Sequence, residues 1–321
     1  DDKELDNHLP AKLKKYIANN DIQFYTINAT NIAQEIGLGN RINMIMQSAF
    51  FKLAEIIPED EAIDYLKDSI KKAYGKKGDK VVNMNYSAVE KGRDSLVKIN
   101  VPESWKTAID EVVGSDEPEF IKNILRPINA QEGDDLPVSA FKGIEDGTLP
   151  NGTAAYEKRG VGVSVPEWII ENCIQCNQCS YICPHSTIRP FLLNEEEVQN
   201  APEAFETKKA VGKGLEGLQY KIQVDTMDCT GCGNCADICP AKEKALVMKP
   251  LETQIEKEIP NWEYAVSKVS HKGDLMPPTT VKGSQFRQPL IEFSGACAGC
   301  GETPYIKLVT QLFGERMMIA N

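Results

Sequence analysis

Apolar residues recur at helical spacing in the first part of the chain. Residues 41–57 are predicted to form an amphipathic helix, which Pro58 is expected to end because the residue before a proline avoids the helical conformation. A second helix is predicted from the acidic residues 59–61 to Lys71 and Lys72, a charge order that the helix dipole favours. The apolar stripe of the first helix consists of Ile42, Ile45, Met46, Ala49, Phe50 and Leu53.

Shorter elements surround these two helices. Residues 12–18 are predicted to be helical, and residues 22–27, rich in β-branched and aromatic side chains, to form a strand. Asn31 is expected to cap a further short helix, since its side chain can accept a hydrogen bond from the first turn. We therefore interpret residues 1–112 as part of an α/β layer that is incomplete as a Rossmann unit.

The rest of the chain changes character twice. Residues 113–153 carry frequent Pro, Gly, Asp and Glu and few periodic apolar runs. This composition predicts an extended linker that lies over other domains, with disorder as the alternative. Residues 154–270 hold most of the cysteines. From residue 271 onward, the pattern predicts a strand at residues 290–293 and a helix at residues 304–313.

Composition excludes several classes of protein. The 321 residues include 41% hydrophobic and 26% charged residues, which is ordinary for a soluble protein and unlike a disordered or fibrous chain. The longest apolar stretch is broken by polar residues, so no membrane span is expected, and the first residues lack the pattern of a signal peptide. A net charge of -11 argues against nucleic acid as the main partner.

Eight of the ten cysteines form two quartets of identical spacing. Each reads C-x2-C-x2-C-x3-C-P, the run of bacterial two-cluster ferredoxins. Three closely spaced thiolates reach three corners of one cubane, and the fourth cysteine points to the other cluster. The first predicted [4Fe-4S] ligand set is Cys173, Cys176, Cys179 and Cys239. The second is Cys229, Cys232, Cys235 and Cys183.

Less specific signals lie in and between the quartets. Zinc ribbons use paired C-x2-C units with a longer gap, so a zinc scaffold is disfavoured. His185 follows Cys183 closely, but eight cysteines already complete both sites, so a surface or capping role is favoured. The string Gly212-x-Gly214-x-x-Gly217 follows no clear strand and is interpreted as a loop rather than a dinucleotide site. This loop also carries lysines that could dock an acidic electron carrier or simply be solvated, Lys208, Lys209 and Lys213. Ile174, Ile182 and Ile238 are expected to keep water away from the clusters.

The remaining pair, Cys297 and Cys300, cannot complete a metal site alone. His271 is the only nearby histidine. A thioredoxin-like redox pair is one interpretation. The other is half of a third metal site, with two ligands from outside these residues; the chain would then be an internal fragment of a larger protein.

Taken together, these features resemble pyruvate:ferredoxin (flavodoxin) oxidoreductases. The resemblance rests on residues 28–30 and 39–44, on Cys183-Pro184-His185, on Ile188-Arg189-Pro190 and on residues 297–304. It implies a multidomain α/β plus α+β fold. Its segments are the end of a γ-type α/β domain (1–112), a linker (113–153), a bacterial two-[4Fe-4S] ferredoxin-like domain (154–270) and the start of a thiamine diphosphate-binding α/β domain (271–321).

The resemblance also implies an activity. This family converts pyruvate and coenzyme A to acetyl-CoA and carbon dioxide, using thiamine diphosphate with Mg²⁺, and passes the electrons through [4Fe-4S] clusters to ferredoxin or flavodoxin. By resemblance, Cys297 and Cys300 ligate a proximal cluster and Glu302 contacts thiamine diphosphate. The whole enzyme is expected to be a cytoplasmic homodimer of anaerobic metabolism, with no membrane or nucleic acid partner.

Several parts of that enzyme are missing from these residues. Two proximal-cluster ligands and a Gly-Asp-Gly run for magnesium and diphosphate are not present in the sequence. The chain alone is therefore expected to lack decarboxylase activity and to have no catalytic residue of its own, while holding two clusters. The alternatives are a self-standing two-cluster electron-transfer module and the corresponding part of another 2-oxoacid oxidoreductase.

Overall fold

The computed structural model describes residues 5–6, 9–109 and 117–320. The chain divides into two compact units, residues 1–116 and 117–321, each with its own internal contacts. Within the described residues, no helix is long and apolar enough to cross a membrane.

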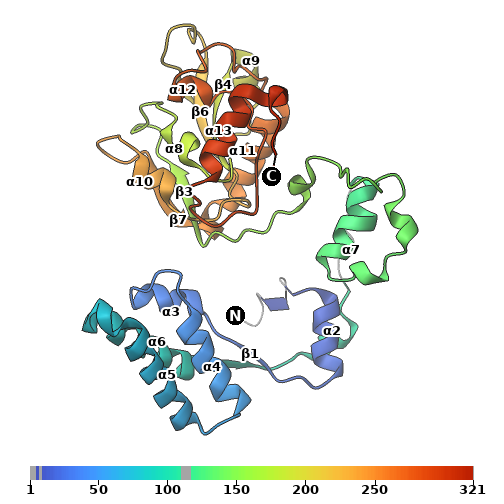
Figure 1. Ribbon diagram of the computed structural model, residues 1–321, viewed down its shortest axis with the longest axis vertical. Helices are drawn as coiled ribbons and strands as arrows, with labels where there is room; N and C mark the ends of the chain where they lie inside the picture. Colours follow the sequence, from blue (N-terminus) through green and yellow to red (C-terminus); the bar gives the residue numbers. More distant parts are fainter. Residues whose placement is uncertain (1–4, 7–8, 110–116, 321) are drawn as a thin grey trace. The chain divides into compact units, whose positions relative to one another are not determined.

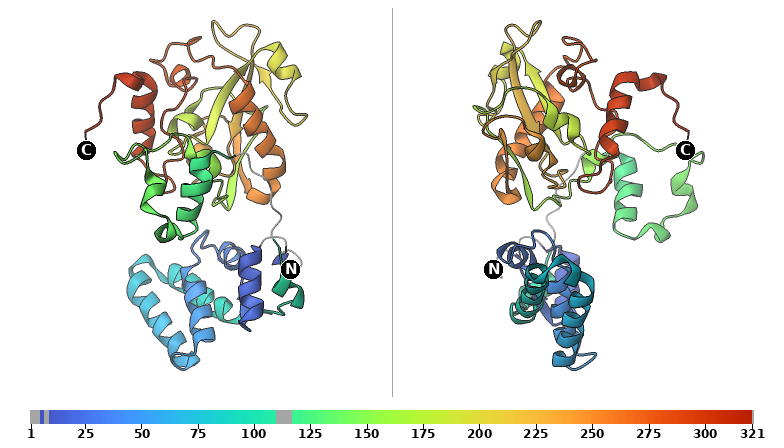
Figure 2. Two further views of the ribbon diagram at one scale, coloured as in Figure 1. Left: turned by 90° about the vertical axis from the view of Figure 1, so that its right-hand side faces the viewer. Right: turned by 60° about the vertical axis from the view of Figure 1, so that its left-hand side comes forward.

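The first unit consists mainly of helices (Figure 2) and includes one short β-ribbon. Strands β1 (Phe24–Thr26) and β2 (Val97–Ile99) pair antiparallel. Its helical elements are α2 (Ala11–Asn19), α3 (Ala29–Glu35), α4 (Asn43–Ala54), α5 (Glu59–Tyr74), η1 (Gly75–Lys77), α6 (Asp79–Asp94) and η2 (Glu103–Thr107). In its described part the sheet has these two strands alone, so helices rather than a parallel sheet make up most of its core.

Helices α4 and α6 approach each other closely. Ile45 and Ser48 are fully buried between them, and the Ser48 hydroxyl donates to the carbonyl of Val89 at 2.6 Å. Gly92 permits this approach, because a Cβ added there would lie 2.4 Å from the carbonyl oxygen of Ile45. The pattern analysis did not predict α6.

Two details of the predicted helices are wrong. The side chain of Asn28, not Asn31, caps α3, because Asn31 supplies the backbone N–H that Asn28 accepts. Helix α4 ends at Ala54, before Pro58, and the backbone of the next residue, Glu55, is left-handed with φ 47°. Ile45 and Ala49 are buried as predicted, whereas the rest of the stripe is largely exposed at Met46, Phe50 and Leu53.

The segment that precedes the cysteines is ordered by short helical turns. They are η3 (Ile121–Leu125), α7 (Arg126–Asn129), η4 (Gly133–Asp135), η5 (Val138–Phe141) and η6 (Thr153–Tyr156). Lys158 then attaches the chain to the second quartet by ion pairs with the buried carboxylates of Asp225, at 2.6 Å, and Asp228. Burial lowers the pKa of Lys158, but the two carboxylates outweigh it and the net pKa is raised.

The cysteine region is built from two interleaved halves (Figure 1). Strand β3 (Ser164–Trp168) precedes the first quartet yet pairs antiparallel with β7 (Leu246–Pro250), which follows the second. Strand β4 (Ile188–Leu193), after the first quartet, pairs with β6 (Gln219–Val224), before the second. Each quartet ends in a short helix, α8 (Gln178–Ile182) or α10 (Asn234–Ile238), and β5 (Lys208–Lys209) extends the β4–β6 sheet.

An aromatic group forms the core of this region. Tyr220 is fully buried, packs edge-on against Trp168 and Phe286, and donates its hydroxyl to the side chain of Asn177 at 2.6 Å. Because the hydroxyl has this partner, the ring is buried without leaving a polar atom unpaired.

The last segment packs on the cysteine region within the same unit. It contributes η7 (Leu251–Thr253), α11 (Ile255–Lys268), α12 (Val281–Ser284), α13 (Thr303–Phe313) and η8 (Gly314–Arg316). The strand predicted at residues 290–293 is absent from the described structure. These residues instead make single contacts with the loop after the first quartet: Phe293 N–H donates to the carbonyl of His185 at 2.9 Å, and the carbonyl of Ile291 accepts from Ser186.

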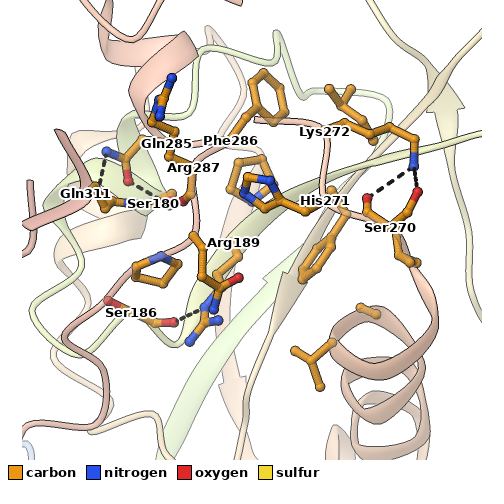
Figure 3. A pocket seen from close by; sticks show the side chains of 18 of the residues that line it. Ser180, Ser186, Arg189, Ser270, His271, Lys272, Gln285, Phe286, Arg287 and Gln311 are labelled. Carbon is orange, nitrogen blue, oxygen red and sulfur yellow. Dashed lines mark hydrogen bonds between the residues drawn. The ribbon is translucent and has the colours of Figure 1, made fainter. Parts of the chain in front are cut away.

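A polar cavity of about 100 Å³ lies between these segments (Figure 3). On one side, the Ser180 hydroxyl donates to Gln285 at 3.0 Å, and Gln285 donates to Gln311. Several cationic side chains line the cavity, and each of three pairs with a carboxylate: Arg189 with Glu292, Lys272 with Glu197, and Arg287 with Asp274. Ion pairs therefore balance three of the four lysine and arginine charges that line the cavity, the fourth being Lys307.

Glu197 connects α9 (Glu195–Gln199) to the end of α11. Its side chain completes a capping box with Asn194 and accepts from the backbone and hydroxyl of Ser270 and from Lys272 at 2.7 Å. Burial raises its pKa, but these donors outweigh burial and lower the pKa to about 2. Since the folded-state pKa lies below the ordinary value, the stabilisation is fully present above about pH 4.5 and is lost as the pH falls towards 2.

Glu197→Gln should therefore lower the free energy of unfolding at pH 7 by about 1–3 kcal/mol. The loss should shrink as the pH falls from 4.5 towards 2, because the wild-type carboxylate is then protonated. Thermal unfolding followed by circular dichroism at several pH values measures this. Glu196→Gln, an exposed neighbour on the same helix, is the control and should change little. Equal melting temperatures for the two variants at pH 7 would contradict the prediction.

Candidate metal centres

The first predicted ligand set lines one cavity. Cys173, Cys176 and Cys179 come from the loop before α8 and its first turn, and Cys239 comes from the end of α10 in the other half. The remaining wall is largely apolar and consists of Trp168, Ile174, Asn177, Tyr220, Ile222, Ala245 and Leu246. The backbone N–H of Ala245 donates to the Cys239 sulfur at 3.4 Å.

The second ligand set lines a second cavity. Cys229, Cys232 and Cys235 lie before and within α10, and Cys183 reaches the cavity from the end of α8. Backbone and hydroxyl groups contact the sulfurs here too: Gly231 N–H lies 3.5 Å from the Cys229 sulfur, and Thr187 Oγ1 lies 3.4 Å from the Cys183 sulfur. The structure thus brings together, in each cavity, three cysteines of one quartet and the fourth of the other.

The donor set of both cavities fits an iron–sulfur cluster. In the described part of the chain, no group of three or more His, Cys, Asp or Glu side chains has the arrangement of a site for one metal ion. A cubane needs a different arrangement, because each thiolate binds its own iron at a separate corner. Four thiols, N–H groups near sulfur and a largely apolar wall are the features by which proteins hold such clusters and set their potentials.

Burial shapes the chemistry of these thiols. It raises the pKa of Cys229 to about 12, with Gly231 N–H acting in the opposite direction, and it raises the pKa of Cys179 and Cys235 further. Deprotonation of these three thiols is therefore unfavourable unless a cationic partner such as iron binds them.

The side chains that shield the cavities differ from those predicted. Ile174 and Ile238 are 61% and 42% exposed, and only Ile174 lines a cavity. The apolar walls come mainly from strand residues instead. His185 is buried, not at the surface: it lines the second cavity and its Nδ1 lies 3.5 Å from the Ser294 hydroxyl. Its buried Nε2 has no hydrogen-bond partner among the described residues.

The pair Cys297 and Cys300 lies beside the second cavity. Cys300 N–H donates to the carbonyl of Cys297 at 3.0 Å, closing a turn before α13. Backbone N–H groups of Thr303 and then Glu302, at the start of α13, lower the pKa of Cys300 and so favour its thiolate. A Cβ added to Gly299 would lie 3.6 Å from the Cβ of Cys232. Glu302 itself is exposed.

Lys307, on α13, is a site residue to which no sequence motif points. It is only 1% exposed and donates to the carbonyls of Ser180, at 2.5 Å, and Cys183, at 3.1 Å. Burial, together with the nearby Arg189 guanidinium, lowers its pKa to about 8, against the opposing electrostatic effect of the Cys183 and Cys179 side chains. Nothing in the local pattern marks this lysine, because its partners lie more than 120 residues earlier in the chain.

The glycine string is a loop, as predicted. Residues 210–218 connect β5 to β6, with Leu215 fully buried beneath the turn and no helix after it. Of its lysines, Lys208 is turned inward and donates to the carbonyls of Ile170 and Cys173. Lys209 and Lys213 are exposed.

Comparison with known protein families agrees with this geometry. Residues 172–243 match a family model described as a 4Fe-4S dicluster domain, and residues 2–95 match one described as pyruvate ferredoxin/flavodoxin oxidoreductase. Residues 106–162 match a domain of unknown function. The chain is 62% identical over 319 residues to pyruvate-flavodoxin oxidoreductase of Enterobacter agglomerans, which covers 99% of this chain and 27% of that protein.

This chain matches a segment of the pyruvate:ferredoxin/flavodoxin oxidoreductases. It is also 59% identical over 320 residues to pyruvate:ferredoxin oxidoreductase of Moorella thermoacetica, again over 99% of the chain and 27% of the relative. A pyruvate dehydrogenase [NADP(+)] of Cryptosporidium parvum is 48% identical over 347 residues, with 99% of this chain and 18% of that protein covered. The chain thus spans about a quarter of the length of the first two oxidoreductases, and the resemblance inferred from the motifs is confirmed.

Proposed function

We propose that this chain is the electron-relay segment of a pyruvate:ferredoxin/flavodoxin oxidoreductase. The observation that carries the proposal is the pair of cavities, each lined by four thiols drawn from both quartets. When bound, [4Fe-4S] clusters accept and pass on single electrons at low potential. The chain's own residues supply the thiolates, exclude water with apolar walls and place N–H groups near sulfur.

The position of Gly299, between Cys297 and Cys300, supports an order for the relay. Gly299 packs against Cys232 and Asn234, whereas the first cavity is lined by no residue of this turn. A cluster held by Cys297 and Cys300, with two ligands from elsewhere in the enzyme, would therefore be nearest to the Cys229–Cys183 site. The Cys173–Cys239 site would then be the exit towards the carrier.

The remaining functional assignments follow the family. In the whole enzyme, pyruvate and coenzyme A would react at thiamine diphosphate with Mg²⁺, and Glu302 would contact the thiamine diphosphate. The proposed domains are the four segments 1–112, 113–153, 154–270 and 271–321. The electrons would pass to ferredoxin or flavodoxin, and the complete enzyme would act in the cytoplasm as a homodimer.

Anaerobic reconstitution of the 321-residue chain with ferrous iron and sulfide tests the proposal. The chain should take up about eight irons, because it holds two complete clusters. After reduction with dithionite and removal of the excess, it should reduce ferredoxin or flavodoxin. With pyruvate, coenzyme A and thiamine diphosphate, it should release no carbon dioxide.

Zinc provides the matched control. The same chain is offered zinc without iron or sulfide, and visible absorbance and metal content are compared. Preferential binding of zinc, with no cluster absorbance after reconstitution, would refute the relay and favour a structural metal scaffold. Eight irons without electron transfer to either carrier would limit the proposal to cluster binding.

A further inference from the structure

Helix α13 supplies a buried cation to the element that the two cavities share. Helix α8 carries Cys179 of the first site and leads directly into Cys183 of the second. The ammonium of Lys307 donates to the carbonyl oxygens of Ser180, Tyr181 and Cys183, at 2.5, 3.3 and 3.1 Å. Its described hydrogen-bond partners are carbonyls alone, without a carboxylate.

The other half of the fold contains an equivalent contact. Lys244 donates to the carbonyls of Asp237 and Cys239, each at 2.8 Å, at the end of α10. Tyr181 and Asp237 hold equivalent positions, two residues after the third cysteine of each quartet. A lysine thus binds the C-terminal carbonyls of both cluster helices, where a helix leaves these acceptors without intrahelical donors. The two lysines differ in exposure: Lys244 is exposed, whereas Lys307 is buried.

This difference has an electrostatic consequence. A buried ammonium without a carboxylate partner is unfavourable unless another anion lies close to it. Four thiolates around each cluster give that anion on both sides of α8. The charge of Lys307 acts through protein rather than water, so its effect on its neighbours is screened far less than that of Lys244.

We propose that Lys307 sets the reduction potentials of the two clusters, with its buried ammonium making both easier to reduce. The inference rests on the proposed function, since it needs both clusters. Each cluster takes up one electron and becomes one unit more negative, and a nearby positive charge stabilises that reduced form. The effect should be larger at the Cys183 site, whose ligand Lys307 contacts directly. Lys307 thus acts by placing a positive charge near the clusters and does not itself react.

Redox titration of the reconstituted full chain, with dithionite as reductant and detection by electron paramagnetic resonance, tests the inference. Lys307→Met and Lys307→Gln, which remove the charge, should shift both midpoint potentials to more negative values. Lys244→Met should give a smaller shift, confined to the Cys239 site. Lys268→Met, an exposed lysine at the end of α11, should leave both potentials unchanged.

The outcomes separate this inference from the proposed function. Full iron content with unchanged potentials in both Lys307 variants would overturn the inference and leave the relay intact. A shift in midpoint potential from Lys244→Met as large as that from Lys307→Met would overturn the argument that burial strengthens the effect of the Lys307 charge. Loss of iron from both neutral variants would make Lys307 a purely structural residue, which also overturns it. A wild-type chain without iron would instead refute the relay itself.

Discussion

Replacing Cys239 with alanine is expected to remove the cluster of Cys173, Cys176 and Cys179, although these residues lie some sixty positions earlier in the chain. The reason is that Cys239 completes their cavity, while its own quartet is completed by Cys183. Iron content should fall from about eight to about four per chain, since one of two four-iron sites loses a ligand. Iron analysis and electron paramagnetic resonance of the reconstituted variant measure the result.

Cys183→Ala is the reciprocal control. It should spare the cluster of Cys173, Cys176 and Cys179 and remove the other, giving the same iron content and a different spectrum. Adding Cys176→Ala to each variant shows which cluster is left. In Cys239→Ala the added change should remove little further iron, because the Cys176 cluster is already lost. In Cys183→Ala it should remove the one remaining cluster. The reverse pattern would show that each quartet binds its own cluster.

The second large effect is expected at Gly231. Its φ of 67° is a left-handed conformation, and an added Cβ would lie 2.7 Å from the carbonyl oxygen of Ser164. Gly231→Ala should therefore combine a backbone cost of about 1–2 kcal/mol with about 1–3 kcal/mol from the steric clash. The N–H that contacts the Cys229 sulfur would move as well, so the cluster at that site should become labile.

Gly233→Ala is the matched control for this prediction. Gly233 also has a positive φ, 80°, but an added Cβ would meet no atom within 4 Å. It should show the backbone cost alone. Release of iron to a chelator over time, together with thermal unfolding, compares the two variants. Equal rates of iron loss in the two variants would contradict the prediction, because they would mean that the structure relieves the clash with Ser164 without a loss of stability.

The features that the sequence predicts correctly are local or follow from exact spacing. The charges at both ends of α5 predict its limits because the dipole acts within one turn. The quartet spacing likewise predicts which cysteines line each cavity, and the structure brings those residues together. Ligation itself stays a prediction.

The features that sequence reasoning missed depend on distant contacts. Residues 290–293 have the apolar character of a strand, but the edge they meet is a loop at His185, so they form single hydrogen bonds rather than a ladder. In the sequence, Lys307 resembles any lysine on an amphipathic helix, and only the structure shows its contact with the carbonyl of Cys183. Helix α6 was missed as well, and its close contact with α4 depends on the small size of Gly92.

The pairing of β3 with β7 has a consequence for how the protein is made. A ribosome adds about 5–20 residues per second, so Cys239 is synthesised some seconds after Cys179. During that interval the first three thiols cannot reach their complete site, and strand β3 has no partner. With the proposed ligand sets, insertion of either cluster would have to wait until both halves have emerged. A cell that makes this protein has to keep the early thiols reduced for that time.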